Sequence, residues 1–119
     1  MAMVRGMHLT PIGEGCVLLE PTDGFDPGDP DAYLVPLAGA LQRMRARRLL
    51  YDLKNVPVID SLYFAWLSSL AAMCRISGIS MVVVSMRPAT AYALALALTM
   101  KDQPPFDCAL DVNRARSLP

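Results

Sequence analysis

Apolar and polar residues follow two alternating periods along this chain, and these periods predict strands and helices in turn. Short apolar runs at 7–12, 15–20, 49–53, 79–85 and 106–110 are typical of strands. Segments 33–47, 61–77, 89–100 and 112–117 carry the spacing or composition of helices. This order predicts an α/β fold with a mixed, mostly parallel sheet of about four to five strands covered by helices. The length corresponds to one domain over residues 1–119.

Several residues set the expected boundaries and the expected core. Pro36 fits a helix only in its first turn, so that helix is expected to begin near Tyr33. Gly78 is expected to stop the helix before it, and Asp111 to cap the last one. The apolar run from Met81 is typical of a strand covered on both faces. We expect the core to include Leu53, Leu67, Leu70, Val82, Val83 and Val84.

Composition and charge point to a soluble cytoplasmic protein. Eleven basic and eleven acidic residues give zero net charge, which implies no bulk attraction to nucleic acid or to an anionic membrane. Four arginines between Arg43 and Arg48 are expected to complement a helix end and stay solvated. Arg87-Pro88 interrupts the most apolar region, so neither half reaches the ~20 residues that span a bilayer. The three cysteines are expected to be small buried residues; they are Cys16, Cys74 and Cys108.

No catalytic or cofactor-binding set emerges from the sequence. His8 is the single histidine, and neither a nucleophile elbow, a phosphate-binding loop nor a dinucleotide fingerprint is present. The three cysteines contain no close pair, so a zinc site is not expected. Asp52 and Asp60 could form a carboxylate pair at one sheet edge, but capping and loop hydrogen bonds are commoner uses. We therefore expect no enzyme and no cofactor.

The pair Asp60-Ser61 is the most informative feature of the chain. It follows the strand 49–53, so Ser61 is expected at the head of a helix, where a phosphate is favoured. Either residue could instead act only as a helix cap. At helical spacing, small residues continue from the serine in one stripe, where an exposed face normally carries Lys and Glu. The expected partner-binding set is Asp60, Ser61, Leu62, Ala65, Ser68 and Ala72.

These residues resemble the core of the STAS domain, the fold of anti-sigma-factor antagonists. In that family a similar strand leads to an Asp-Ser pair at the head of the second helix, here Asp60 and Ser61. The apolar Leu62-Tyr63 after the serine is closer to the stressosome scaffold subfamily. Further resemblance lies in the strand, turn and Pro-Ala helix start at 81–91 and in the Ala-Leu-Asp-Val run from Ala109.

The resemblance implies a cytoplasmic regulatory protein that binds a serine kinase of the histidine-kinase-like ATPase fold. Phosphorylation of Ser61 by that kinase would change the complex, and a phosphatase would reset it. Two alternatives stay open at this point. A small-ligand sensor would need an apolar cavity of several hundred Å3, on the order of ordinary ligand pockets. A purely structural scaffold subunit would need a large apolar surface for self-association, which the helix 89–100 could supply unless it is buried.

Overall fold

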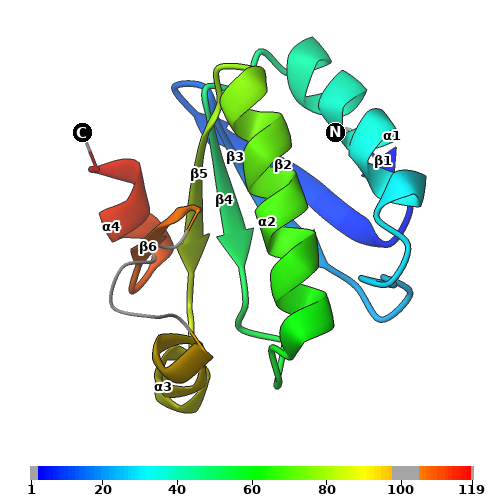
Figure 1. Ribbon diagram of the computed structural model, residues 1–119. Helices are drawn as coiled ribbons and strands as arrows, with labels where there is room; N and C mark the ends of the chain where they lie inside the picture. Colours follow the sequence, from blue (N-terminus) through cyan, green and yellow to red (C-terminus); the bar gives the residue numbers. More distant parts are fainter. Residues whose placement is uncertain (1–2, 98–104, 119) are drawn as a thin grey trace.

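The computed structural model describes residues 3–97 and 105–118, which build one six-stranded sheet in the order β1-β2-β3-β4-β5-β6 (Figure 1). The strands are β1 (Met3–Val4), β2 (Met7–Gly13), β3 (Cys16–Pro21), β4 (Arg48–Asp52), β5 (Ser80–Val84) and β6 (Asp107–Ala109). The helices are α1 (Asp31–Arg43), α2 (Ser61–Ile76), α3 (Pro88–Ala97) and α4 (Val112–Arg116).

The sheet is mixed, as predicted. β1, β2 and β3 pair antiparallel, whereas β3, β4, β5 and β6 pair parallel in sequence order. The described sheet has one strand more than the expected four to five, because β1 adds two residues at one edge. A strand of two residues is too short to show an alternation of apolar and polar positions, so the sequence pattern could not predict β1.

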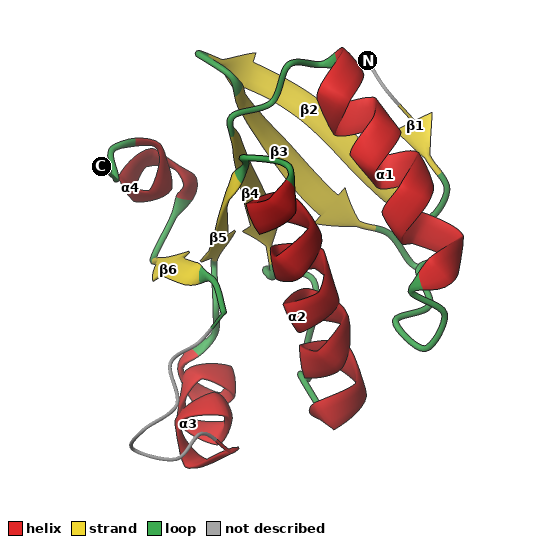
Figure 2. Ribbon diagram, turned by 45° about the horizontal axis from the view of Figure 1, so that its top comes forward, coloured by secondary structure: helices red, strands yellow, loops and turns green. Residues whose placement is uncertain are grey.

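Helices cover the two faces of the sheet unequally. α1 and α2 lie together on one face, while the short α4 lies on the other face near β6 (Figures 1 and 2). β4 serves both sides, since Leu49 and Tyr51 enter the large cluster under α1 and α2 and Leu50 enters the small cluster under α4. β5 also contributes to both clusters: Val83 enters the large cluster under α1 and α2, and Val82 and Val84 enter the small cluster under α4. All the expected core residues are at most 1% exposed, which confirms that set: Leu53, Leu67, Leu70, Val82, Val83 and Val84.

The boundaries predicted for α1 were wrong at both ends. The helix begins at Asp31, so Pro36 lies beyond its first turn with its side chain in solvent. It ends at Arg43 because Arg45 takes the left-handed conformation, with φ of 55°. The Ala46 N–H then donates to the Leu41 carbonyl at 3.0 Å, which closes the helix end. Glycine usually occupies the left-handed position, so an arginine there gave no stop signal in the sequence.

The end of α2 was predicted correctly because the same motif there uses glycine. Gly78 has φ of +74°, and the Ile79 N–H donates to the Cys74 carbonyl at 2.8 Å. The cap expected at α4 is also present, since Asp111 accepts a hydrogen bond from the Arg114 N–H at 2.9 Å.

α3 lies beyond the carboxyl end of β5, apart from α1 and α2 (Figures 1 and 2). Its predicted end, Met100, falls outside the described residues. Thr90 is buried, but Ala89, Ala91 and Tyr92 are exposed, so this helix presents apolar side chains to solvent. No helix in the described part of the chain is long and apolar enough to cross a membrane.

The expectation of three buried cysteines was wrong for one of them. Cys16 and Cys74 are buried, but Cys108 is exposed. Cys108 lies on the three-residue edge strand β6, where no further strand in the described part of the chain covers it.

Candidate functional site

The candidate site begins at the first turn of α2, where two adjacent residues take different roles. Asp60 is the N-cap, with extended backbone, and its Oδ1 accepts a hydrogen bond from the Tyr63 N–H at 2.8 Å. Ser61 is the first helical residue and its side chain is exposed. Because Asp60 supplies the cap, the Ser61 hydroxyl is not needed for it and faces solvent at the positive end of the helix.

The loop between β4 and α2 holds Ser61 at the carboxyl edge of the parallel strands. Asp52 ends β4, and its Oδ1 accepts a hydrogen bond from the Lys54 N–H at 2.9 Å. The Val56 N–H donates to the Leu53 carbonyl at 2.9 Å, and the Val56 side chain is buried. Open α/β sheets place their binding sites at this edge.

A buried polar network fixes α2 to the sheet directly behind the serine. The Tyr51 and Tyr63 hydroxyl groups lie 2.7 Å apart, and the Trp66 Nε1–H donates to the Tyr51 hydroxyl oxygen at 2.9 Å. Burial raises the pKa of Tyr63 to about 12, and it raises the pKa of Tyr51 further. Both hydroxyl groups therefore stay neutral at physiological pH, and the network holds the first two turns of α2 in place.

The solvent side of α2 carries the expected small-residue stripe. Ser61, Ala65 and Ala72 are exposed, while Ser68 is half-buried. Leu62 is 53% exposed beside the serine. With Asp60, which is also exposed, the structure places all of the predicted partner-binding residues on the outward side or start of one helix.

Sequence reasoning missed two apolar side chains that extend this face. Val58 precedes the helix and is 68% exposed, and Ile76 ends it and is 88% exposed. Ile76 follows Ala72 by four residues, so helical spacing could have placed it on the stripe. No period marks Val58, because it lies in a loop. We use the term docking face for the predicted set together with these two side chains: Val58, Asp60, Ser61, Leu62, Ala65, Ser68, Ala72 and Ile76.

Asp52 and Asp60, the possible carboxylate pair, each make contacts that stabilise the fold. Asp52 is only 4% exposed and lies 3.5 Å from the Lys54 ammonium, which also lies 3.2 Å from Glu20. Glu20 and Asp52 raise the pKa of Lys54, so it remains a cation between them. Asp60 is engaged as the helix cap. The residues that the structure describes contain no group of three side chains able to hold a metal ion.

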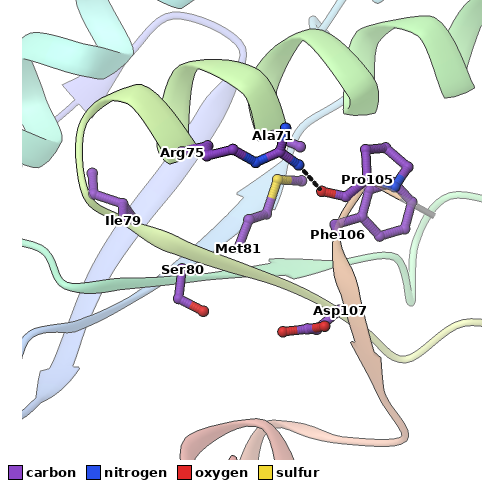
Figure 3. Close-up of a pocket in the computed structure, with 8 residues that line it drawn as sticks. All are labelled: Ala71, Arg75, Ile79, Ser80, Met81, Pro105, Phe106 and Asp107. Carbon is purple, nitrogen blue, oxygen red and sulfur yellow. Dashed lines mark hydrogen bonds between the residues drawn. The ribbon is translucent and has the colours of Figure 1, made fainter. Parts of the chain in front are cut away.

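A hollow of about 350 Å3 lies between the end of α2 and the start of β6 (Figure 3). Arg75 and Asp107 contribute charged groups to it, alongside Met81 and Phe106. The Arg75 Nη2 donates to the Pro105 carbonyl at 3.2 Å across one side. This charged surface hollow differs from the apolar cavity that the ligand-sensor alternative would need. A second hollow of about 510 Å3 lies beside the start of α2, and Phe25, Val56, Val58 and Tyr63 are among the residues that line it.

Known structures share this architecture at low sequence identity. A serine-to-glutamate variant of Moorella thermoacetica RsbS aligns with a TM-score of 0.69 and 14% identity, over 92% of this chain and 91% of that one. The protein TM1081, solved by NMR, aligns with a TM-score of 0.73 and 15% identity, over 98% and 88%. A chain of the stressosome, a signal integration and transduction hub, aligns with a TM-score of 0.63 and 15% identity, over 92% of each chain.

Sequence comparison adds no relative to these structures. No protein-family model matches the chain, and no curated protein matches it. The structural likenesses cover nearly the whole chain and confirm the STAS fold that the sequence resemblance predicted.

Proposed function

We propose that this protein is a cytoplasmic regulatory STAS domain with no catalysis of its own, and that it works by partner switching. It would act as an anti-sigma-factor antagonist or as a component of a stressosome. The observation that carries the proposal is the exposed Ser61 at the head of α2, where the small-residue docking face begins. The structural likeness to RsbS and to a stressosome chain supports it.

The partner is a serine kinase of the histidine-kinase-like ATPase fold. It transfers the γ-phosphoryl group of ATP to the Ser61 Oγ and releases ADP. The helix start suits this product, because the first N–H groups of a helix have no partner within the helix and favour an anion. The Asp60 carboxylate accepts the Tyr63 N–H, so the cap and the phosphate use different groups.

Phosphorylation acts on docking through charge and bulk. A phosphate adds about −1.5 to −2 charges at neutral pH. Ser61 lies directly after Asp60, and its neighbours along the face are as small as Ala65 and Ala72. A partner that packs closely on this face must therefore desolvate the new charge beside a carboxylate, and the complex weakens. A phosphatase removes the group and restores the docking-competent surface.

The direct test is phosphorylation by candidate kinases of this fold, encoded in the same genome, followed by mass spectrometry of the α2 peptide. We expect one phosphate, on Ser61. The control is Ser61→Ala, which should take up none, and the matched variant is Ser69→Ala on the same helix, which should be labelled like the wild type. Labelling that persists in Ser61→Ala would contradict the proposal.

A structural scaffold subunit is the second candidate, and the exposed apolar side chains of α3 favour it. Tyr92 is 67% exposed, and Ala91 is exposed beside it. A scaffold would assemble through such a surface without a kinase. Binding of a kinase at the docking face that is weakened by Ser61→Asp but unchanged by Tyr92→Ser separates the two functions.

A further inference from the structure

Five arginines gather at the end of the molecule where β4 begins, and we call this set the basic pole: Arg43, Arg45, Arg47, Arg48 and Arg116. The Arg47 N–H donates to the Gly15 carbonyl at 2.7 Å, and the Arg47 side chain lies against Gly15. The Arg48 Nη1 donates to the Ala115 carbonyl at 2.7 Å, which brings the end of α4 to the same place. The chain thus folds two separate segments, 43–48 and the end of α4, into one cationic surface.

The opposite end of the molecule carries exposed carboxylates on the loop that precedes α1 and at the first residue of that helix. Asp23, Asp26, Asp29 and Asp31 are all exposed, and we call this set the acidic loop. Leu62 lies close to Gly28 of this loop, so the loop lies beside the start of α2. In Figure 1 this loop lies at the lower right, whereas the end of α1 lies at the top. The zero net charge therefore hides a strong separation of charge.

The topology explains why the charges separate. α1 and α2 run in the same direction, so both positive helix ends lie near the acidic loop and both negative ends near the basic pole (Figure 1). Asp31 and Arg43 complement the two ends of α1 in this way. Arg45, Arg47 and Arg116 add charge beyond that need, and within the described residues none of them forms an ion pair. Their charge is available to another molecule.

We propose that the basic pole binds the acidic loop of a second copy of this chain, so that copies associate head to tail. The basic pole and the acidic loop have opposite charge but lie at opposite ends of one molecule. They can therefore pair only between two copies. Like poles repel, so a symmetric dimer in which one basic pole meets the other is disfavoured. A head-to-tail contact joins two different surfaces and forms rings or open chains. The charges that support this contact are independent of the proposed phosphorylation of Ser61.

The association must depend on salt, because both surfaces are exposed. Between roughly 0.1 M and roughly 1 M sodium chloride, the screening length falls from about 10 Å to about 3 Å. Sedimentation velocity of the unphosphorylated full chain over a concentration series measures this directly. We expect the sedimentation coefficient to rise with concentration at the lower salt and to stay at the monomer value at the higher salt. A monomer at every concentration and both salts would overturn the proposal.

A matched pair of charge reversals locates the contact. Arg45→Glu lies in the basic pole, whereas Arg87→Glu changes the net charge equally from an exposed position away from the pole, after β5. We expect Arg45→Glu to lose the concentration dependence and Arg87→Glu to keep it. Circular dichroism and thermal melts establish that each variant is folded. Equal effects of the two reversals would show that net charge alone controls association and would contradict a localised contact.

Two complementary charge-reversal variants test the pairing itself. This test does not rely on one variant losing self-association. Arg43→Glu/Arg45→Glu blocks the basic pole, and Asp23→Lys/Asp29→Lys blocks the acidic loop. None of these four side chains makes a hydrogen bond to another described residue. Each variant alone should remain a monomer at the lower salt, and an equimolar mixture should associate. A mixture that sediments as two unchanged monomers would overturn the proposed pairing.

Discussion

The two sides of helix α2 differ in the size and burial of their side chains. The side toward the sheet holds large residues that are almost fully buried, including Trp66, Leu67 and Leu70. The side toward solvent carries small residues such as Ala65 and Ala72, with Ser61 at its start. One side fixes the fold and the other is free to take a partner. Substitutions on the two sides should therefore separate stability from binding.

The largest effect on stability is expected from the sheet side. Leu67 is 1% exposed, so Leu67→Ala leaves a cavity and should lower the free energy of unfolding by roughly 2–5 kcal/mol. Leu62→Ala makes the same chemical change on the solvent side, where Leu62 is 53% exposed. It should lower the free energy of unfolding by no more than about 0.5 kcal/mol. Urea denaturation measures both. Equal losses would contradict the assigned faces of the helix.

The buried hydroxyl network should give the next largest effect. Tyr51→Phe leaves the Trp66 N–H and the Tyr63 hydroxyl without their shared partner, and should cost about 1–3 kcal/mol. Tyr92→Phe removes a hydroxyl from a side chain that is 67% exposed and serves as the control. Thermal denaturation should show a clear drop for the first variant and almost none for the second. The reverse order would rule out a stabilising role for the network.

The helix cap should contribute a smaller amount. Asp60→Ala removes the acceptor for the Tyr63 N–H and should cost about 1 kcal/mol, whereas Asp60→Asn keeps an acceptor and should cost less. Chemical denaturation of both variants tests the assignment. A loss of the same size in Asp60→Asn would mean that the charge of Asp60, and not its hydrogen bond, stabilises α2.

The smallest effect on stability is expected on the docking face, where binding should change instead. Ala72→Glu places a charge on an exposed position in the middle of that face and should change the free energy of unfolding by within about 0.5 kcal/mol. The charge must be desolvated when a partner packs on it, so affinity for the kinase should fall. Ala72→Ser keeps the small size and is the control. Unchanged affinity in the glutamate variant would exclude this part of α2 from the interface.

The sequence predicted those parts of the fold that leave a local chemical signal. Gly78 marked the end of α2 because glycine favours the left-handed backbone, whereas Arg45 adopts the same conformation at the end of α1 without such a signal. The two-residue β1 is held by its pairing with β2, which no local period encodes. The exposure of Cys108 likewise depends on which strand lies at the sheet edge.

The candidate site shows the same limit. The Asp60-Ser61 pair and the spacing of Ala65 and Ala72 predicted an outward stripe, because helical geometry follows directly from spacing. The choice between Asp60 and Ser61 as the cap needed backbone coordinates, since both residue types can cap. The basic pole also needed the fold, because Arg116 joins the arginines of the α1–β4 loop only through tertiary contacts.

The most direct test of the partner switch is calorimetric titration of the partner kinase with wild type, Ser61→Ala and Ser61→Asp. Alanine keeps the surface flat, so its affinity should match that of the wild type while phosphorylation is abolished. Aspartate adds charge beside Asp60 and should bind more weakly, with thermal stability retained because aspartate suits a helix start. Equal affinities for all three proteins, with no phosphate on the wild type, would leave Ser61 as an ordinary residue of a helix start.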